Sequence, residues 1–129
     1  MTHNEISGII IDVSMMIHKK LGPGLLESVY KKVLAYELRK RGLDVIEEHP
    51  VPFKWEEGVE MDIGFRVDLF VERKVMVELK STEKMARVYK KILLTYIRLS
   101  STKLGLLLNF GEEYLKDGIC RLVNGLEEN

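Results

Sequence analysis

Apolar residues in the first forty positions recur at three- and four-residue steps, which is the spacing of amphipathic helices. Asn4 is placed to cap a first helix, and the LGPG segment at 21–24 ends it because glycine and proline there cannot continue a helix. A second helix is predicted over residues 26–41, with Gly42 as a left-handed terminator. The apolar positions of the first helix are Ile6, Ile9, Ile10, Val13, Met16 and Ile17.

From Asp44 onward the period shortens to two, as in β-strands, and the sequence WEEG at 55–58 indicates a turn. A third helix is expected over residues 85–100, followed by KLGLLLNF, a continuous apolar run typical of a strand buried on both faces. This order predicts one α/β (α+β) domain over residues 1–129, with a mixed central β-sheet flanked by helices. The predicted strands cover 45–53, 67–71, 75–79, 103–110 and 119–123.

The most strand-like segment, RVDLFVERKVMVELKS at 66–81, carries Asp68, Glu78 and Lys80 inside its apolar runs. If residues 72–74 form a three-residue hairpin loop, pairing continues outward from the loop until Asp68 lies opposite Glu78. Like charges directly opposite each other on a sheet repel, with β-carbons roughly 5 Å apart. The arrangement therefore needs a positive charge between the two carboxylates.

A divalent cation would meet that need. Magnesium prefers carboxylate oxygens and retained waters, and Lys80, two residues beyond Glu78, returns to the same face near the ion. The alternative is a solvated polar face on which Glu78 pairs with Lys80. Alternation assigns one face to Asp68, Phe70, Met76, Glu78 and Lys80, and an apolar core face to Val67, Leu69, Val71, Val75, Val77 and Leu79.

The second predicted helix carries another pair of polar groups. In LGPGLLESVYKKVL, Glu27 and Tyr30 stand three residues apart, so a carboxylate and a phenol share one helix face. The alternative is that Glu27 is a first-turn acid favoured by the helix dipole and Tyr30 is a packing residue.

Three segments, LGPGLLESVY, RVDLFVERKVMVELKS and YIRLSSTKLGLLLNFG, together resemble the GxxExxY protein family of the PD-(D/E)xK nuclease-like superfamily. The resemblance covers residues 9–124. It implies a restriction-endonuclease-like core of about four strands with flanking helices. It also implies that Asp68 and Glu78 are metal ligands, with the Leu79 carbonyl as a third.

The same resemblance implies roles for residues outside the carboxylate pair. Lys80 would orient or activate the attacking water, Glu27 would assist at the metal, and Tyr30 and Tyr96 would be accessory residues. Relatives often carry a glutamine four residues before the tyrosine of the third helix, whereas this chain has Ile92 there. The apolar stripe expected on that helix consists of Met85, Val88, Ile92, Tyr96 and Leu99, with Ile92 as a core residue.

Charge is balanced over the whole chain, with 20 basic and 20 acidic residues, so any attraction for nucleic acid must be local. Basic residues gather between Ser81 and Lys103, where Glu83 is the single acid. Three of them fall on the helix side opposite the expected apolar stripe, which suits a phosphate backbone. An ordinary solvated helix face is the alternative. The candidate contacts with nucleic acid are Lys84, Arg87, Lys91 and Arg98.

Several site classes are excluded by the residues available. The one cysteine, Cys120, rules out an internal disulfide and a zinc site of several thiolates, and we expect it to be a small buried residue. The three histidines lack ligand spacing, and no Gly-rich phosphate loop or nucleophile elbow is present. The sequence shows neither a signal peptide nor a membrane span, so the expected location is the cytoplasm.

The sequence thus predicts a nuclease that hydrolyses nucleic-acid phosphodiester bonds with magnesium or manganese, by attack of an activated water on phosphorus. Two alternatives stay open. One is a catalytically weak or inactive nuclease-derived domain that binds nucleic acid or a protein partner. The other is an interaction domain, such as a homo-oligomer, in which the carboxylate pair is incidental.

Overall fold

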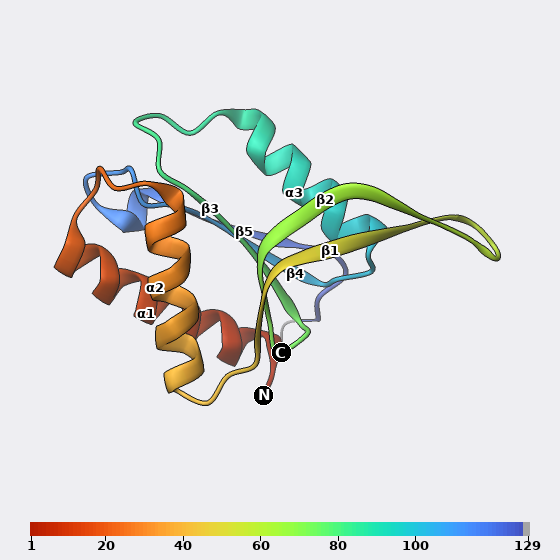
Figure 1. Cartoon of the computed structure of the whole chain (residues 1–129), viewed down its shortest axis with the longest axis horizontal. Helices are drawn as coiled ribbons and strands as arrows, with labels where there is room; N and C mark the ends of the chain where they lie inside the picture. Colours follow the sequence, from red (N-terminus) through yellow and green to blue (C-terminus); the bar gives the residue numbers. More distant parts are fainter. Residues whose placement is uncertain (128–129) are drawn as a thin grey trace.

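The chain forms a five-stranded mixed sheet with helices on both faces (Figure 1). The computed structural model describes residues 1–127. The strand order is β1-β2-β3-β4-β5; β3 and β4 pair in parallel, and the other three neighbouring pairs are antiparallel. This confirms the predicted α+β class. The elements are α1 (His3–Leu21), α2 (Glu27–Lys40), β1 (Val45–Glu56), β2 (Val59–Val71), β3 (Val75–Lys80), α3 (Arg87–Leu99), β4 (Leu104–Asn109), the 3-10 helix η1 (Leu115–Gly118) and β5 (Ile119–Val123).

Helix α1 begins at a capping box, and the prediction that Asn4 caps it was wrong. The Thr2 hydroxyl accepts the Glu5 N–H, and the Glu5 carboxylate accepts the Thr2 N–H, each at 3.1 Å. A threonine followed three residues later by glutamate satisfies two N–H groups at once, which a lone asparagine cannot do. The predicted end is correct, since Gly22, with φ of 72°, is the C-cap.

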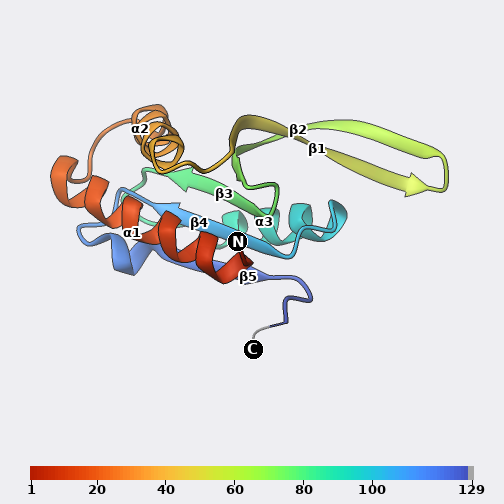
Figure 2. The same ribbon diagram turned by 90° about the horizontal axis from the view of Figure 1, so that it is seen from below.

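The first two strands form one long hairpin, whose far half protrudes from the molecule (Figure 2). Strand β1 runs to Glu56 and β2 begins at Val59, so the turn lies within the predicted WEEG segment, but β2 is eight residues longer at its start than predicted. Most side chains near the turn are exposed on both sides of the hairpin. A strand without a buried face has no alternating pattern to recognise.

Two hydrophobic cores sandwich the sheet. Helices α1 and α2 cover one face with residues such as Ile10 and Leu34, and α3 covers the other through Leu93 and Ile97. The parallel β3–β4 pair requires a crossover, and α3 is that crossover, so the face predicted to be polar is partly covered. Strand β4 is buried along its whole length, as predicted.

Individual residues depart from the predicted faces. Val67 packs in the α3 core together with Met76, not with Leu69 as alternation suggested. Cys120 is half-buried beside the α3 core, where a buried side chain was expected. Within residues 1–127, no helix combines the length and the apolar composition that crossing a bilayer requires.

Helix α3 turns a different side to the sheet from the one predicted. Its buried residues are Leu93 and Ile97, whereas Ile92, expected in the core, is 38% exposed. Gly105 of β4 lets Leu93 and Ile97 pack closely on the sheet, because a β-carbon at position 105 would lie only 3.2 to 3.3 Å from these side chains. The helix also begins at Arg87, two residues later than predicted.

The chain leaving β3 is held by the end of β4. The Asn109 side chain is fully buried; its carbonyl accepts the N–H groups of Thr82 and Gly111, and its amide donates to the Thr82 carbonyl, all at 3.0 Å. Lys80 pairs with Asn109 in the parallel ladder. This clasp therefore fixes the end of β3, where the charged residues lie.

We expect Gly111→Ala to break the clasp. An added β-carbon would lie 2.2 Å from the Thr82 carbonyl oxygen, which is backbone and cannot rotate away. Overpacking of this kind costs about 1–3 kcal/mol or more. The control is Gly8→Ala, where nothing lies within 4 Å and helix propensity should add about 0.5–1 kcal/mol. Urea unfolding checks both; equal stability of Gly111→Ala and the wild type would contradict the clasp.

Candidate active site

The β2–β3 hairpin has the predicted loop and register. Lys74 donates its N–H to the Val71 carbonyl at 3.0 Å, and Val71 pairs with Val75 across the three-residue loop. The ladder continues to the pair Leu69 and Val77 and then stops. Beyond that pair, backbone N–H groups on both strands need acceptors other than the facing strand.

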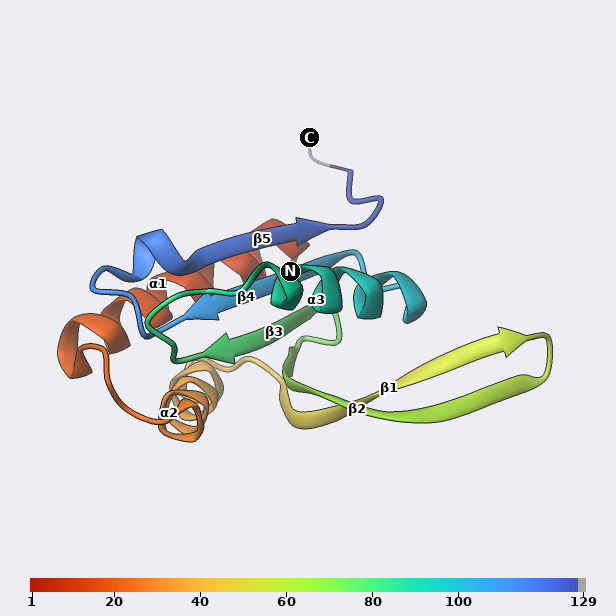
Figure 3. The same cartoon turned by 90° about the horizontal axis from the view of Figure 1, so that it is seen from above.

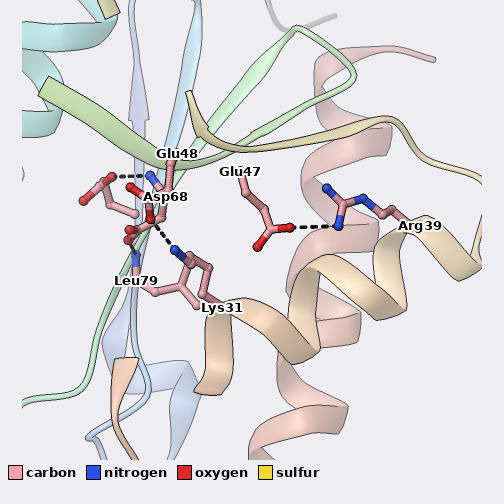
Figure 4. Close-up of polar contacts among 7 residues, drawn as sticks. Lys31, Arg39, Glu47, Glu48, Asp68 and Leu79 are labelled. Atoms are coloured by element: carbon pink, nitrogen blue, oxygen red, sulfur yellow. Dashed lines mark hydrogen bonds and ion pairs between the residues drawn. The ribbon is translucent and has the colours of Figure 1, made fainter. Parts of the chain in front are cut away.

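Two carboxylates supply those acceptors in a reciprocal arrangement. Glu78 accepts the Asp68 N–H at 2.7 Å. In turn, Asp68 accepts the Leu79 N–H at 2.8 Å (Figure 4). The acids therefore lie on neighbouring strands close to each other, as the register predicted. Their side chains fill the opening where β2 and β3 separate, and each is anchored to the opposite strand's backbone.

Burial dominates the electrostatics of this pair. It raises the pKa of Glu78 from 4.5 to about 8, with the charge of Asp68 contributing further, and it also raises the pKa of Asp68. The Leu79 N–H and the ammonium groups of Lys31 and Lys80 pull the pKa of Asp68 back down. The metal-free site therefore holds a proton on Glu78 near neutral pH, because two ionised acids this close and this buried are too costly.

Lys80 lies beside the pair and is steadied by an aromatic ring. Its charge lowers the pKa of both Asp68 and Glu78, and its ammonium sits 4.3 Å from the centre of the Tyr89 ring in the first turn of α3. Such a cation–π contact holds a flexible lysine without neutralising it. Sequence analysis did not find Tyr89, because the contact joins a strand to a helix across the loop at 81–86.

Two further charged residues at the site were missed from the sequence. Glu48 of β1 lies between residues that pair with Leu69 and Val67, which puts it next to Asp68 across the hairpin. Its carboxylate pairs with the Lys31 ammonium of α2, and its charge raises the pKa of both Asp68 and Glu78. The one available signal was that Lys31 follows Glu27 by four residues on the same helix face.

A model of the PD-(D/E)XK nuclease superfamily matches residues 4–122, nearly the full length of the chain. The chain belongs to the PD-(D/E)XK nuclease superfamily. The mixed sheet with helices on both faces is consistent with that fold, and nucleases of this superfamily generally use divalent metals. Neither the comparison with curated proteins nor the comparison with solved structures gives a significant match.

Two other residues of this PD-(D/E)XK chain were expected at the site, Glu27 and Tyr30. Neither takes part in the hydrogen bonds that join Asp68 and Glu78 to the opposite strands. Glu27 is exposed at the first position of α2, so its expected role at the metal stays a prediction. Tyr30 is fully buried; its hydroxyl donates to the Gly22 carbonyl at 2.5 Å and accepts the Leu25 N–H at 3.2 Å. The phenol therefore shapes the loop before α2, which in turn accepts the Ser81 hydroxyl at the Leu25 carbonyl.

Residues of α3 divide between packing and exposure. Tyr96, expected as an accessory residue, stacks on Phe65 of β2 with ring centres 3.6 Å apart. The four basic candidates are exposed, and the three within the helix lie away from its buried side, which is not the apolar stripe that was predicted. They are Lys84, Arg87, Lys91 and Arg98. Ile92 lies on the exposed flank of the helix, not in the core.

The donors around the pair suit a hard cation. Asp68 and Glu78 offer carboxylate oxygens, and the Leu79 carbonyl faces the same strand edge as its N–H, which contacts Asp68. Within residues 1–127, no three His, Cys, Asp or Glu side chains are grouped closely enough to bind a metal by themselves. An ion here would need the backbone carbonyl and waters, which is the coordination that magnesium favours.

The raised pKa of Glu78 predicts how stability depends on pH without metal. Because the folded protein holds this proton more tightly than the unfolded chain, its stabilising effect is complete below pH 4.5 and is lost as pH rises through about 8. Glu78→Gln keeps an oxygen for the Asp68 N–H but cannot ionise, so its free energy of unfolding should fall less over that range. Urea unfolding in EDTA across this pH range, with exposed Glu83→Gln as control, tests this. Parallel curves for the wild type and Glu78→Gln would contradict it.

Proposed function

We propose that this chain is a metal-dependent nuclease that hydrolyses nucleic-acid phosphodiester bonds, and that it belongs to the GxxExxY family within its superfamily. The observation that carries the proposal is the reciprocal carboxylate pair, Asp68 and Glu78, with Lys80 beside it. Neutral side chains can also accept the Asp68 and Leu79 N–H groups, so a purely structural hairpin does not require two acids buried against each other, where burial disfavours their charged forms. A site that binds a cation gains from them.

Magnesium or manganese is the proposed cofactor, held by Asp68, Glu78 and the Leu79 carbonyl. Oxygen donors without thiolates or imidazoles select hard divalent ions. Bound there, the ion supplies Lewis-acid polarisation of the phosphodiester and lowers the pKa of water. Glu78 must release its proton for the ion to bind, so affinity should rise with pH.

The remaining groups act on the substrate's charge. The Lys80 ammonium lies near both carboxylates and is held over Tyr89, where it can neutralise charge developing on phosphate or orient water. Glu27, one helical turn before Lys31, is proposed to assist at the metal from the open side of the site. The exposed basic side of α3 is proposed to follow the phosphate backbone, because Tyr89 brings the first turn of that helix to Lys80.

The deciding experiment measures cleavage of labelled single- and double-stranded DNA and RNA with magnesium, manganese or EDTA. We expect metal-dependent cleavage that Lys80→Met and Asp68→Asn each reduce by roughly 10²-fold or more, because each removes a group acting on developing charge. The matched control is Lys54→Met, whose ammonium pairs with Glu57 near the hairpin turn. Cleavage that persists in EDTA, or that survives Lys80→Met, would refute the proposed mechanism.

The basic side of α3 is tested by salt dependence. Replacing Arg87, Lys91 and Arg98 together by glutamine should weaken binding to duplex DNA and flatten the slope of log affinity against log salt by roughly 2–3, about 0.9 per lost phosphate contact. The control is the triple glutamine variant of Lys19, Lys20 and Lys40, which are exposed on α1 and α2 and remove the same charge. Equal slopes for the two variants would remove α3 from the interface.

A second candidate function is a nuclease-derived binding domain without effective catalysis. The observation in its favour is Ile92, an exposed apolar residue at the position where relatives often carry glutamine. Its signature in the cleavage experiment is nucleic-acid binding that EDTA leaves unchanged, with no turnover under any metal.

A further inference from the structure

Glu48 interrupts the regular backbone of β1 to reach across to α2. Its φ of 51° lies in the left-handed region, which a residue with a side chain adopts only when its surroundings hold it there. Its carboxylate forms an ion pair with Lys31 beside Asp68, whereas the preceding Glu47 pairs with Arg39 at 2.9 Å, further along the helix (Figure 4). The two adjacent acids therefore contact different turns of α2. Glu48, the acid beside Asp68, is the one with the left-handed backbone.

Lys31 is a largely covered lysine. Its side chain is 16% exposed, compared with 52% for Lys54 of the hairpin. Holding a long side chain in one place costs conformational entropy, and ion pairs on open surface rarely repay it. For Lys31 this entropy cost is offset by two acids, because its ammonium pairs with Glu48 and its charge also acts on Asp68.

The ion pair also engages the β1 acid that lies next to Asp68. Within residues 1–127, Glu48 does not complete a three-acid metal cluster with Asp68 and Glu78, although its charge acts on both. We propose that Lys31 is the built-in counter-cation of this site: paired with Glu48 and facing Asp68, it stabilises the metal-free protein and competes with the divalent ion. This inference rests on the proposed metal-binding function and adds a device that sets its affinity.

The physical basis is that two cations close to one carboxylate repel each other. A divalent ion at Asp68 would be repelled by the Lys31 charge, which already acts on Asp68 in a partly buried site where screening by water is incomplete. Repulsion from the Lys31 charge would therefore weaken binding of the ion. Removing that charge should tighten ion binding and, without an ion, leave Glu48 and Asp68 uncompensated.

Calorimetric titration with manganese and with magnesium, together with thermal unfolding in EDTA, tests this competition. Lys31→Met should bind the ion roughly tenfold more tightly than the wild type and melt at a lower temperature in EDTA. The control is Lys32→Met, the same substitution on the exposed side of the same helix, which should match the wild type in affinity. Lys31→Gln provides a second neutral variant should Lys31→Met fold poorly, and Lys31→Arg, which keeps the charge, should restore the wild-type affinity.

The outcomes separate this inference from the proposed function. If the wild type binds the ion and neither neutral variant binds more tightly than Lys32→Met, the competition is refuted while the metal site stands. If the wild type ignores the ion and Lys31→Met or Lys31→Gln binds it, Lys31 excludes the ion and the inference is supported. If no variant responds to either metal, both the metal site and the competition are refuted.

Discussion

The two cross-strand hydrogen bonds of Asp68 and Glu78 are the constraint around which the rest of the molecule is organised. Where β2 and β3 separate, the N–H groups of Asp68 and Leu79 lose their ladder partners and need other acceptors. The carboxylates meet this need, but at the cost of burying two acids side by side, which raises the pKa of Glu78 to about 8. The same contacts that complete the hairpin therefore leave it with a site that a cation would stabilise.

Three elements around the pair bring charges that change the cost of ionising it, and a fourth brings an aromatic ring. Lys80 comes from β3, Lys31 from α2 and Glu48 from β1, and Tyr89 of α3 steadies Lys80. The balance of these charges sets the energetic cost of ionising the pair, which is the cost that the proposed metal would offset. Because the chain belongs to the PD-(D/E)XK nuclease superfamily, a metal at this site is the group that would support catalysis. In the protein without a metal, the charges of Lys31 and Lys80 offset part of that cost.

The crossover between the parallel strands links the site to the surface proposed for the substrate. Helix α3 passes over the sheet between β3 and β4 (Figure 3), and the Tyr89 ring in its first turn contacts the ammonium of Lys80 from the end of β3. Its opposite side is free to carry exposed arginines and a lysine. The Asn109 side chain holds the connecting loop at Thr82 by two hydrogen bonds, which fixes where the chain leaves β3.

Local rules in the sequence were enough for the helices, the buried β4 and the three-residue loop that sets Asp68 near Glu78, because each depends on residues close together in the chain. The place of Glu48 depended on the tertiary structure. Two register shifts interrupt the β1–β2 hairpin, and counting back from its turn without them would place Glu48 opposite Val67 instead of beside Asp68. The buried side of α3 was predicted wrongly, since Val88, Ile92 and Leu99 form as apolar a stripe in the sequence as Leu93 and Ile97. Gly105 of the following strand leaves space for Leu93 and Ile97 against the sheet, and Phe65 of β2, distant in sequence, stacks on Tyr96.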